Sequence, residues 1–313
     1  MSETASPIRH GRLLRIAAAL VVLLALAGYV VVQYMTGGAG PPRCVVRATE
    51  SGDGAGSTYE MSPEQAANAA TISAVGTTRG LPERAVTIAL ATALQESALR
   101  NLEHGDRDSL GLFQQRPSKG WGTEEQILDP VYSAGEFYDH LATVPGYSRL
   151  PLTEAAQRVQ RSGFPQAYAK HEPDATLLAA ALTGRTPAVL TCPALSGTAV
   201  GDPAKVRAEL VRAFGPKVLP AAETSGQAGA PRVAEVSVPV AAGGARGEMA
   251  GGKPARRGWE LAHWAVAQSA ALRIGEVSYA GRVWKAKEAG RGWQSAGGDA
   301  DASTTAVRIR TVQ

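Results

Sequence analysis

The chain has 313 residues, enough for one or two domains that each bury a core, and its 35 Gly and 19 Pro indicate that part of it is linker. The net charge is +4, of which three Arg and one Glu in the first fifteen residues account for +2. The remaining charge does not form the concentrated basic stretch that nucleic-acid binding requires, so no nucleic-acid partner is expected.

An uncharged run, Ile16 to Tyr34, follows this basic start and predicts a membrane helix. As a helix it would rise about 28 Å, close to the hydrocarbon thickness of a bilayer. Because three Arg precede the run and none directly follows it, the positive-inside rule predicts a cytoplasmic tail over 1–15, a single-pass anchor over 16–35 and an extracytoplasmic remainder. A cleaved signal peptide is the alternative, although the run is long for one.

Gly, Pro, Ser and Thr dominate residues 36–59, and this composition predicts a stalk. Cys44 within it and Cys192 far downstream both lie on the exported side, where disulfides persist. A Cys44–Cys192 bridge is therefore expected, with two buried free thiols as the alternative.

Residues 60–192 predict a helical domain. Ser62 to Gln65 has the pattern of a capping box with a first-turn proline, and Val86, Leu90 and Leu94 have the spacing of a buried helix face. Further helices are expected at 123–128, 131–143, 153–162 and 173–184. No stretch in this region alternates with the period of two that is typical of strands.

The chain after Cys192 changes in character. Residues 193–257 predict one helix and a Gly-, Ala- and Pro-rich linker with a strand-like run at 233–240, and residues 258–313 predict a small α+β domain. Four of the five Trp lie in this last segment, either as its core or as a binding surface. The expected fold class is thus mainly α: an N-terminal transmembrane helix, an α-helical domain and a small C-terminal α+β domain.

The stretch from Ala91 to Trp121 carries the chemistry. Glu96 lies late in an apolar helix, where half-burial would disfavour the carboxylate, as a general acid near neutral pH requires. The Gly-rich, acidic loop that follows ends in Gly111-Leu112-Phe113-Gln114 and can fold back over the helix end. On this pattern alone, a Glu near a helix end is more often a solvated surface residue.

Glu96-Ser97, a polar loop and then Gly111-Leu112-Phe113-Gln114 resembles the E-S … G-L-M-Q signature of the superfamily of soluble-type lytic transglycosylases and goose-type lysozymes. The resemblance covers residues 60–185, and its wider run is most similar to exported actinobacterial-type cell-wall proteins. It implies a lysozyme-like domain over 60–192 whose partner is peptidoglycan.

The resemblance also implies roles for single residues. Glu96 would be the catalytic acid that protonates the glycosidic oxygen between N-acetylmuramic acid and N-acetylglucosamine. Ser97 and Gln114 would support the site or bind sugar, Tyr168 is a candidate for the same role, and Asp106 would help to hold a water. Goose-type enzymes place a further acid where this chain has Gln115-Arg116, and a single acid favours 1,6-anhydromuramoyl products over hydrolysis.

The expected function is therefore a membrane-anchored enzyme that cleaves peptidoglycan glycan strands, a lytic transglycosylase or a lysozyme. The alternative is an inactive lysozyme-like module that binds peptidoglycan or a cell-wall protein. A transporter is disfavoured, because one uncharged span offers no intramembrane ion path. The five His are scattered without metal-ligand spacing, so neither a metal nor a cofactor is expected.

Overall fold

The computed structural model describes residues 8–35, 41–48, 57–164, 166–194, 197, 199–220, 234–240, 253–297 and 304–313. The chain divides into two units, Met1–Pro41 and Pro42–Gln313. The first half of the predicted cytoplasmic tail and much of the predicted linker lie outside the described residues.

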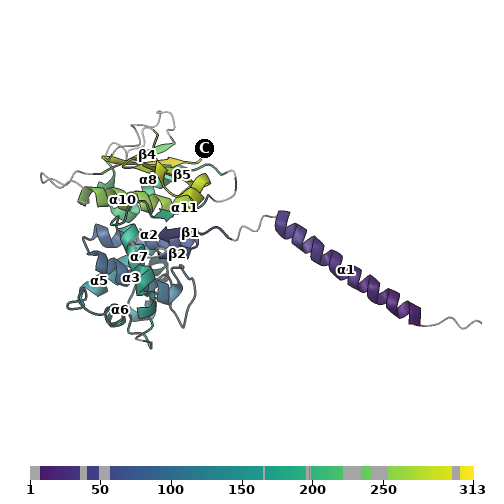
Figure 1. The fold of residues 1–313 in the computed structure, drawn as a ribbon. Coiled ribbons are helices and arrows are strands. Elements are labelled where there is room, and N and C mark those ends of the chain that lie inside the picture. Colours follow the sequence, from purple (N-terminus) through teal and green to yellow (C-terminus); the bar gives the residue numbers. More distant parts are fainter. Residues whose placement is uncertain are drawn as a thin grey trace, which may run out of the picture. The chain divides into compact units, whose positions relative to one another are not determined.

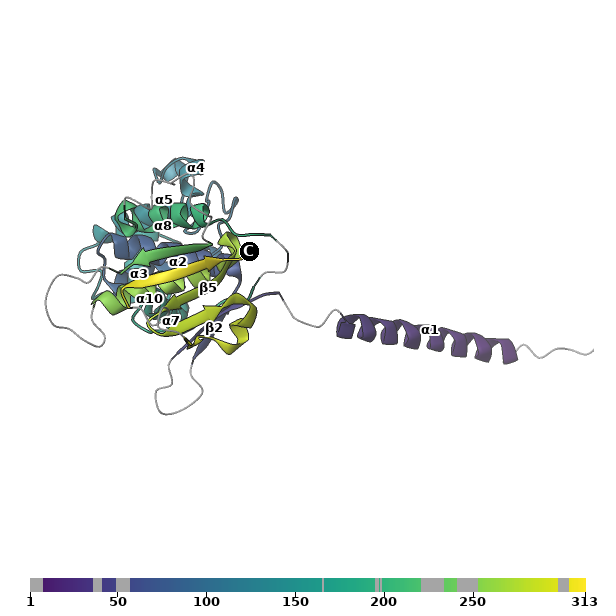
Figure 2. The same ribbon diagram turned by 90° about the horizontal axis from the view of Figure 1, so that it is seen from above.

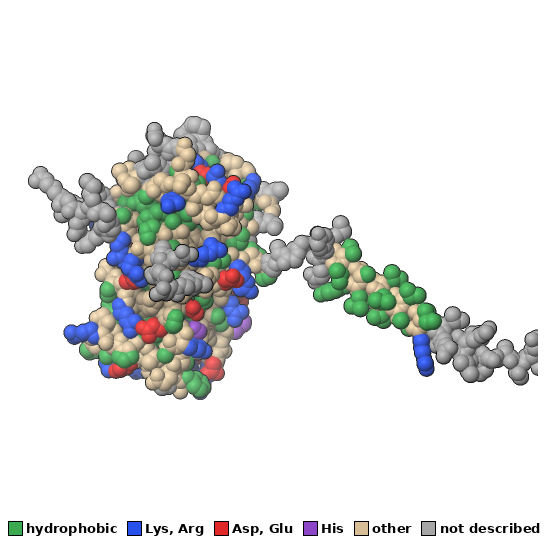
Figure 3. Space-filling view, in the orientation of Figure 1, with side chains coloured by type: hydrophobic (Ala, Val, Ile, Leu, Met, Phe, Trp, Pro, Cys, Tyr) green, Lys and Arg blue, Asp and Glu red, His purple; other side chains and the backbone are tan. Residues whose placement is uncertain are grey.

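The first unit is built on one helix, α1 (Ile8–Met35). Its stretch Leu14–Val31 has a mean hydropathy of 2.4 and no buried residue, and Figure 3 shows apolar side chains along its visible face. By length and composition this helix is able to cross a membrane. A signal sequence near an N-terminus has the same properties, so the structure confirms a long apolar helix and leaves both interpretations open.

The second unit begins with a helical part that matches the sequence closely (Figure 1). It contains α2 (Pro63–Thr78), α3 (Glu83–Ser97), η1 (Pro117–Lys119), α4 (Glu124–Ile127), α5 (Pro130–Ala142), α6 (Leu152–Gln160), η2 (Ala169–His171) and α7 (Glu172–Leu182). The capping box at Ser62 and Gln65 is present, since the Ser62 side chain accepts from the Gln65 amide and the Gln65 side chain accepts from that of Ser62. The four further helices each begin and end within two residues of their predicted bounds.

A small antiparallel sheet, which the sequence did not indicate, closes one end of the helical part. Its strands are β1 (Cys44–Arg47), β2 (Thr58–Met61) and β3 (Leu190–Thr191), in the order β2-β1-β3. Cys44 and Val46 are buried, and Cys44 forms the predicted disulfide with Cys192. Residues 44–47 and 58–59 therefore belong to the second unit and not to a stalk. Strands of four residues are too short for a clear alternation, and β3 lies far away in sequence.

In the C-terminal part of the second unit, the described residues form three helices and a five-stranded antiparallel sheet. The helices are α8 (Pro203–Phe214), α10 (Lys253–Ala267) and α11 (Ser269–Leu272), with short turns η3 (Pro216–Val218) and η4 (Ala286–Arg291). The sheet runs β4 (Glu235–Pro239), β8 (Ala306–Thr311), β5 (Ile274–Tyr279), β6 (Arg282–Lys285), β7 (Gln294–Ser295). The strand-like run predicted within the linker is thus an edge strand of this sheet, with Val236 opposite Ile309.

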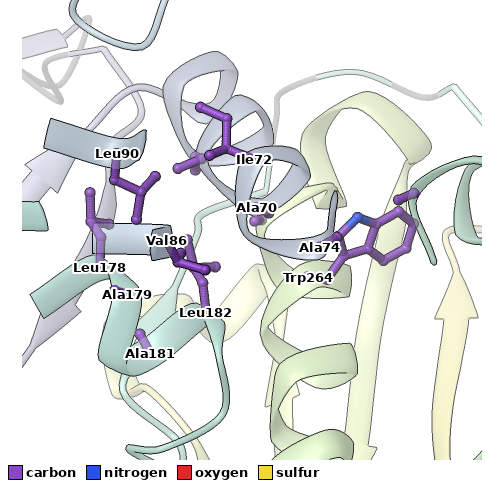
Figure 4. Packing of buried hydrophobic residues seen from close by; sticks show 14 of the residues in the cluster. Ala70, Ile72, Ala74, Val86, Leu90, Leu178, Ala179, Ala181, Leu182 and Trp264 are labelled. Atoms are coloured by element: carbon purple, nitrogen blue, oxygen red, sulfur yellow. The ribbon is translucent and has the colours of Figure 1, made fainter. Parts of the chain in front are cut away.

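The helices of the C-terminal part lie between its sheet and the helical part, as Figures 1 and 2 show. Helix α10 packs on strands β5 and β8 with one face and on α2 and α7 with another. Figure 4 shows Trp264 of α10 beside Ala74 of α2, while Val86 of α3 and Leu182 of α7 lie on the other side of α2. One continuous core therefore joins the helical and C-terminal parts, and residues 258–313 do not form a separate body.

The four C-terminal tryptophans belong to this core. Trp264 and Trp284 are essentially fully buried, and Trp259 and Trp293 are at most 9% exposed. The interpretation of these side chains as core is confirmed, and they do not form a binding surface.

Two titratable side chains of α10 are buried where it meets the helical part. Glu260 hydrogen-bonds Thr77 and forms an ion pair with Arg257, and its burial raises the pKa of its carboxyl group. His263 is fully buried, and its burial lowers the imidazole pKa to about 4.

The hydrogen bonds of His263 define its neutral state. Its Nδ1–H donates to the Ala181 carbonyl at 2.7 Å, and its Nε2 accepts from the Val189 amide at 3.3 Å. A proton on Nε2 would face the Val189 N–H, so the fold requires the neutral ring.

Candidate active site

The candidate site begins at the end of helix α3. Residues 85–94 of α3 are buried, and in its last turn Gln95 and Glu96 are half-buried. The helix stops because Ala98 and Leu99 both adopt left-handed conformations, with φ of 52° and 60°, which turn the chain away. A carboxyl group is thereby placed at the boundary between core and solvent, on a helix that the core holds rigidly.

Tyr168 positions this carboxyl group. Its hydroxyl donates to Oε1 of Glu96 at 2.7 Å, although 72 residues separate the two in sequence. Tyr168 is fully buried as a residue, and this burial raises the pKa of its phenol, so the ring remains a neutral donor at physiological pH. The structure thus brings together two of the residues singled out in the sequence.

Ser97 holds the following loop against α3. Its hydroxyl lies 2.8 Å from the Leu112 carbonyl oxygen and 3.1 Å from that of Ala93, and the side chain is buried. Leu110 and Gln115 exchange both backbone hydrogen bonds, which closes a tight turn around Gly111–Gln114. Ser97 therefore fixes this turn against the end of α3.

Gln114 is the half-exposed end of that turn. Its backbone is left-handed, with φ of 48°, an unfavourable conformation for a residue other than glycine that is seen at functional sites. Its side chain lies against Gly105, where an added Cβ would be only 1.8 Å from Oε1 of Gln114. The same Cβ would be 2.8 Å from the Ser109 backbone carbonyl oxygen, so any side chain at position 105 would force this loop to shift.

The two Asp residues of this loop have different surroundings. The Asp106 side chain is 91% exposed, its nearest cation is Arg107 at 4.0 Å, and no hydrogen bond to Glu96 is found among the described residues. Asp108 accepts from the Ser118 amide at 2.9 Å and from Arg116 at 2.6 Å, and these interactions hold its pKa well below the ordinary range. Asp108 is therefore a structural anion that fixes the loop.

Further polar contacts at the site join residues that the sequence did not connect. Nε2 of Gln160 donates to the Phe113 carbonyl at 2.8 Å, and His171 Nε2 lies 3.2 Å from Oε1 of Gln95. Burial and the neighbouring Lys170 lower the pKa of His171. Each of these two contacts joins residues that are far apart in the sequence, so no local sequence pattern indicates it.

The described part of the chain contains no group of three His, Cys, Asp or Glu side chains that is able to hold a metal ion. A cavity of about 440 Å³ lies in the C-terminal part, beside Arg273 and Val312, and no residue of the Glu96 site lines it. No family model matches the chain, and no curated protein matches it.

Proposed function

We propose that this chain is a membrane-anchored enzyme that cleaves the glycan strands of peptidoglycan outside the cytoplasm, with Glu96 as general acid. The observation that carries this proposal is the hydrogen bond from the buried Tyr168 hydroxyl to the half-buried Glu96. This bond fixes the orientation of the Glu96 carboxyl group, which a general acid requires. The turn held by Ser97, the residue after Glu96, supports the same site.

The chemistry follows from one oriented carboxyl group. Glu96 donates its proton to the glycosidic oxygen as the bond from that oxygen to C1 of N-acetylmuramic acid breaks. The C6 hydroxyl of the same sugar forms a new bond to C1, and its proton returns to Glu96. Tyr168 donates to the carboxylate in the interval between the two transfers, which stabilises the charged form.

A single acid favours this internal reaction over hydrolysis. Hydrolytic glycosidases use a second carboxylate roughly 5 to 10 Å from the acid. Asp108 is occupied by Arg116 and Ser118, and the Asp106 side chain is 91% exposed, so neither has surroundings that favour it as a partner of Glu96. We therefore propose 1,6-anhydromuramoyl products, with a lysozyme that yields reducing ends as the alternative.

The proposed location rests on two features of the chain. Helix α1 has the length and hydropathy of a membrane anchor, and the basic residues before it favour a cytoplasmic N-terminus. The Cys44–Cys192 disulfide supports an oxidising, extracytoplasmic compartment for the second unit.

The test compares dye release from labelled, purified peptidoglycan by the detergent-solubilised full chain and its variants. Glu96→Gln should lose about 10² to 10⁴ in rate, because the amide keeps the shape but has no proton to give. Glu103→Gln, a matched change at an exposed Glu of the adjacent loop, should cleave at the wild-type rate. Equal rates for wild type and Glu96→Gln would refute the assignment. If the wild-type chain binds peptidoglycan and releases no dye, the binding module replaces the enzyme.

A further inference from the structure

Phe164 is 78% exposed, more than any other large apolar side chain among the described residues of the second unit, and Val200 follows at 63%. A lone exposed apolar residue needs no explanation by itself. Phe164 differs because it lies on the segment between α6 and η2, which also carries Tyr168, the residue that contacts Glu96.

The segment is fastened to the candidate site on both sides of Phe164. Before it, Gln160 donates to the carbonyl of Phe113 in the loop that Ser97 fixes, at 2.8 Å. After it, Tyr168 donates to Glu96 at 2.7 Å. The backbone that carries the exposed ring is thus held by the same residues that build the site.

Further hydrogen bonds order the segment from within. The Phe164 amide donates to the Ser162 hydroxyl at 3.2 Å, and the Phe164 carbonyl accepts from the Ala167 amide at 3.1 Å. Gln157 of α6 donates to the Ser162 carbonyl at 2.8 Å. Both backbone polar groups of Phe164 are therefore hydrogen-bonded, and the residue lies four positions before Tyr168, which contacts Glu96.

We propose that Phe164 is a sugar-binding residue whose ring stacks on the apolar face of a pyranose in the glycan strand bound across Glu96. This inference rests on the proposed function, because it takes the glycan strand as the bound polymer. An aromatic ring on a residue whose backbone amide and carbonyl are both hydrogen-bonded has little conformational entropy to lose on binding. Phe has no polar group, so it recognises the flat C–H face of a sugar ring and takes no part in proton transfer.

The test measures binding of the β-1,4-linked tetramer of N-acetylglucosamine to the full chain in detergent by titration calorimetry, in the non-cleaving Glu96→Gln background. Phe164→Ala should weaken binding roughly tenfold, the effect of losing about 60 Å² of apolar contact. Phe164→Trp should bind at least as tightly as the parent. Val200→Ala is the matched control at another exposed apolar residue and should leave the affinity unchanged.

Equal affinity for Phe164→Ala and its parent, or no binding by the parent, would overturn the inference. Cleavage with Glu96 restored separates this result from the proposed function: Phe164→Ala should raise KM and leave kcat unchanged. If the wild-type chain cleaves and Phe164→Ala changes neither the affinity nor KM, the role of Phe164 is refuted and the proposed function stands. A chain that does not cleave, but binds the tetramer more weakly after Phe164→Ala, refutes the enzyme and retains the sugar-binding residue.

Discussion

Acidification should destabilise the fold through His263, and the size of the effect follows from its surroundings. The fold holds this ring neutral, and burial lowers its pKa from 6.5 to about 4. A group whose pKa is lower in the folded than in the unfolded state contributes stability that is present above the unfolded pKa and lost as pH falls. The loss should begin below about pH 6.5 and amount to about 2 to 3 kcal/mol by pH 4.5.

The assay is urea unfolding of the full chain in detergent at pH 7.5 and 4.5, followed by the fluorescence of the buried tryptophans. The quantity of interest is the change in unfolding free energy between the two pH values, compared with that of His263→Gln. Gln is neutral at both pH values and is able to donate to Ala181 and accept from Val189. The unfolding free energy of His263→Gln should therefore fall less on acidification than that of the wild-type chain, by about 2 to 3 kcal/mol.

Two features make this comparison specific. Burial raises the pKa of Glu260, so its titration favours the fold at low pH, but both variants carry Glu260 and its contribution cancels. As a control at an exposed His of α5, His140→Gln should lose as much unfolding free energy between pH 7.5 and 4.5 as the wild-type chain. The reasoning is refuted if His263→Gln loses as much stability on acidification as the wild-type chain.

Two other predictions concern the site and the disulfide. Tyr168→Phe should lower kcat about tenfold, because it removes one hydrogen bond to Glu96 while the ring still fills its buried position; an unchanged rate on purified peptidoglycan would mean that Tyr168 does not position the acid. Replacing Cys44 and Cys192 by Ser should lower the unfolding free energy by up to about 5 kcal/mol, an upper figure from chain entropy for so long a loop. Urea unfolding checks this change, and two titratable thiols in the unreduced, denatured wild-type chain would contradict the bridge.

Local signals in the sequence were sufficient for the helices and for the strand-like run at 233–240, and insufficient for the small sheet of β1, β2 and β3. The capping box at Ser62 and the proline-led helices depend on neighbours a few residues away, and the structure has them where expected. Strand β1 acquires its role only by pairing with β2 and with β3, which lies far along the chain, so composition alone suggested a stalk. The same reasoning explains why one continuous core was not foreseen: it depends on Trp264 meeting α2.

The sequence singled out several residues of the candidate site but not the contacts between them. Glu96 stood out by its place late in an apolar helix and by the motif around it, and Ser97 and Tyr168 were named with it. The contact between Tyr168 and Glu96 spans 72 residues, and that between Gln160 and Phe113 spans 47, so only the packed helices reveal them. The Asp106 side chain is 91% exposed, and its role in holding a water stays a prediction.

The most direct test of the central claim is mass spectrometry of the fragments released from purified peptidoglycan by the wild-type chain and by Glu96→Gln. The proposed chemistry predicts wild-type fragments with 1,6-anhydromuramoyl ends, one water lighter than the hydrolysis products, and almost none from Glu96→Gln. Fragments with only reducing ends would make the domain a lysozyme and Asp106 the first partner to test. Release of the same fragments in the same amounts by both proteins would contradict Glu96 as the acid.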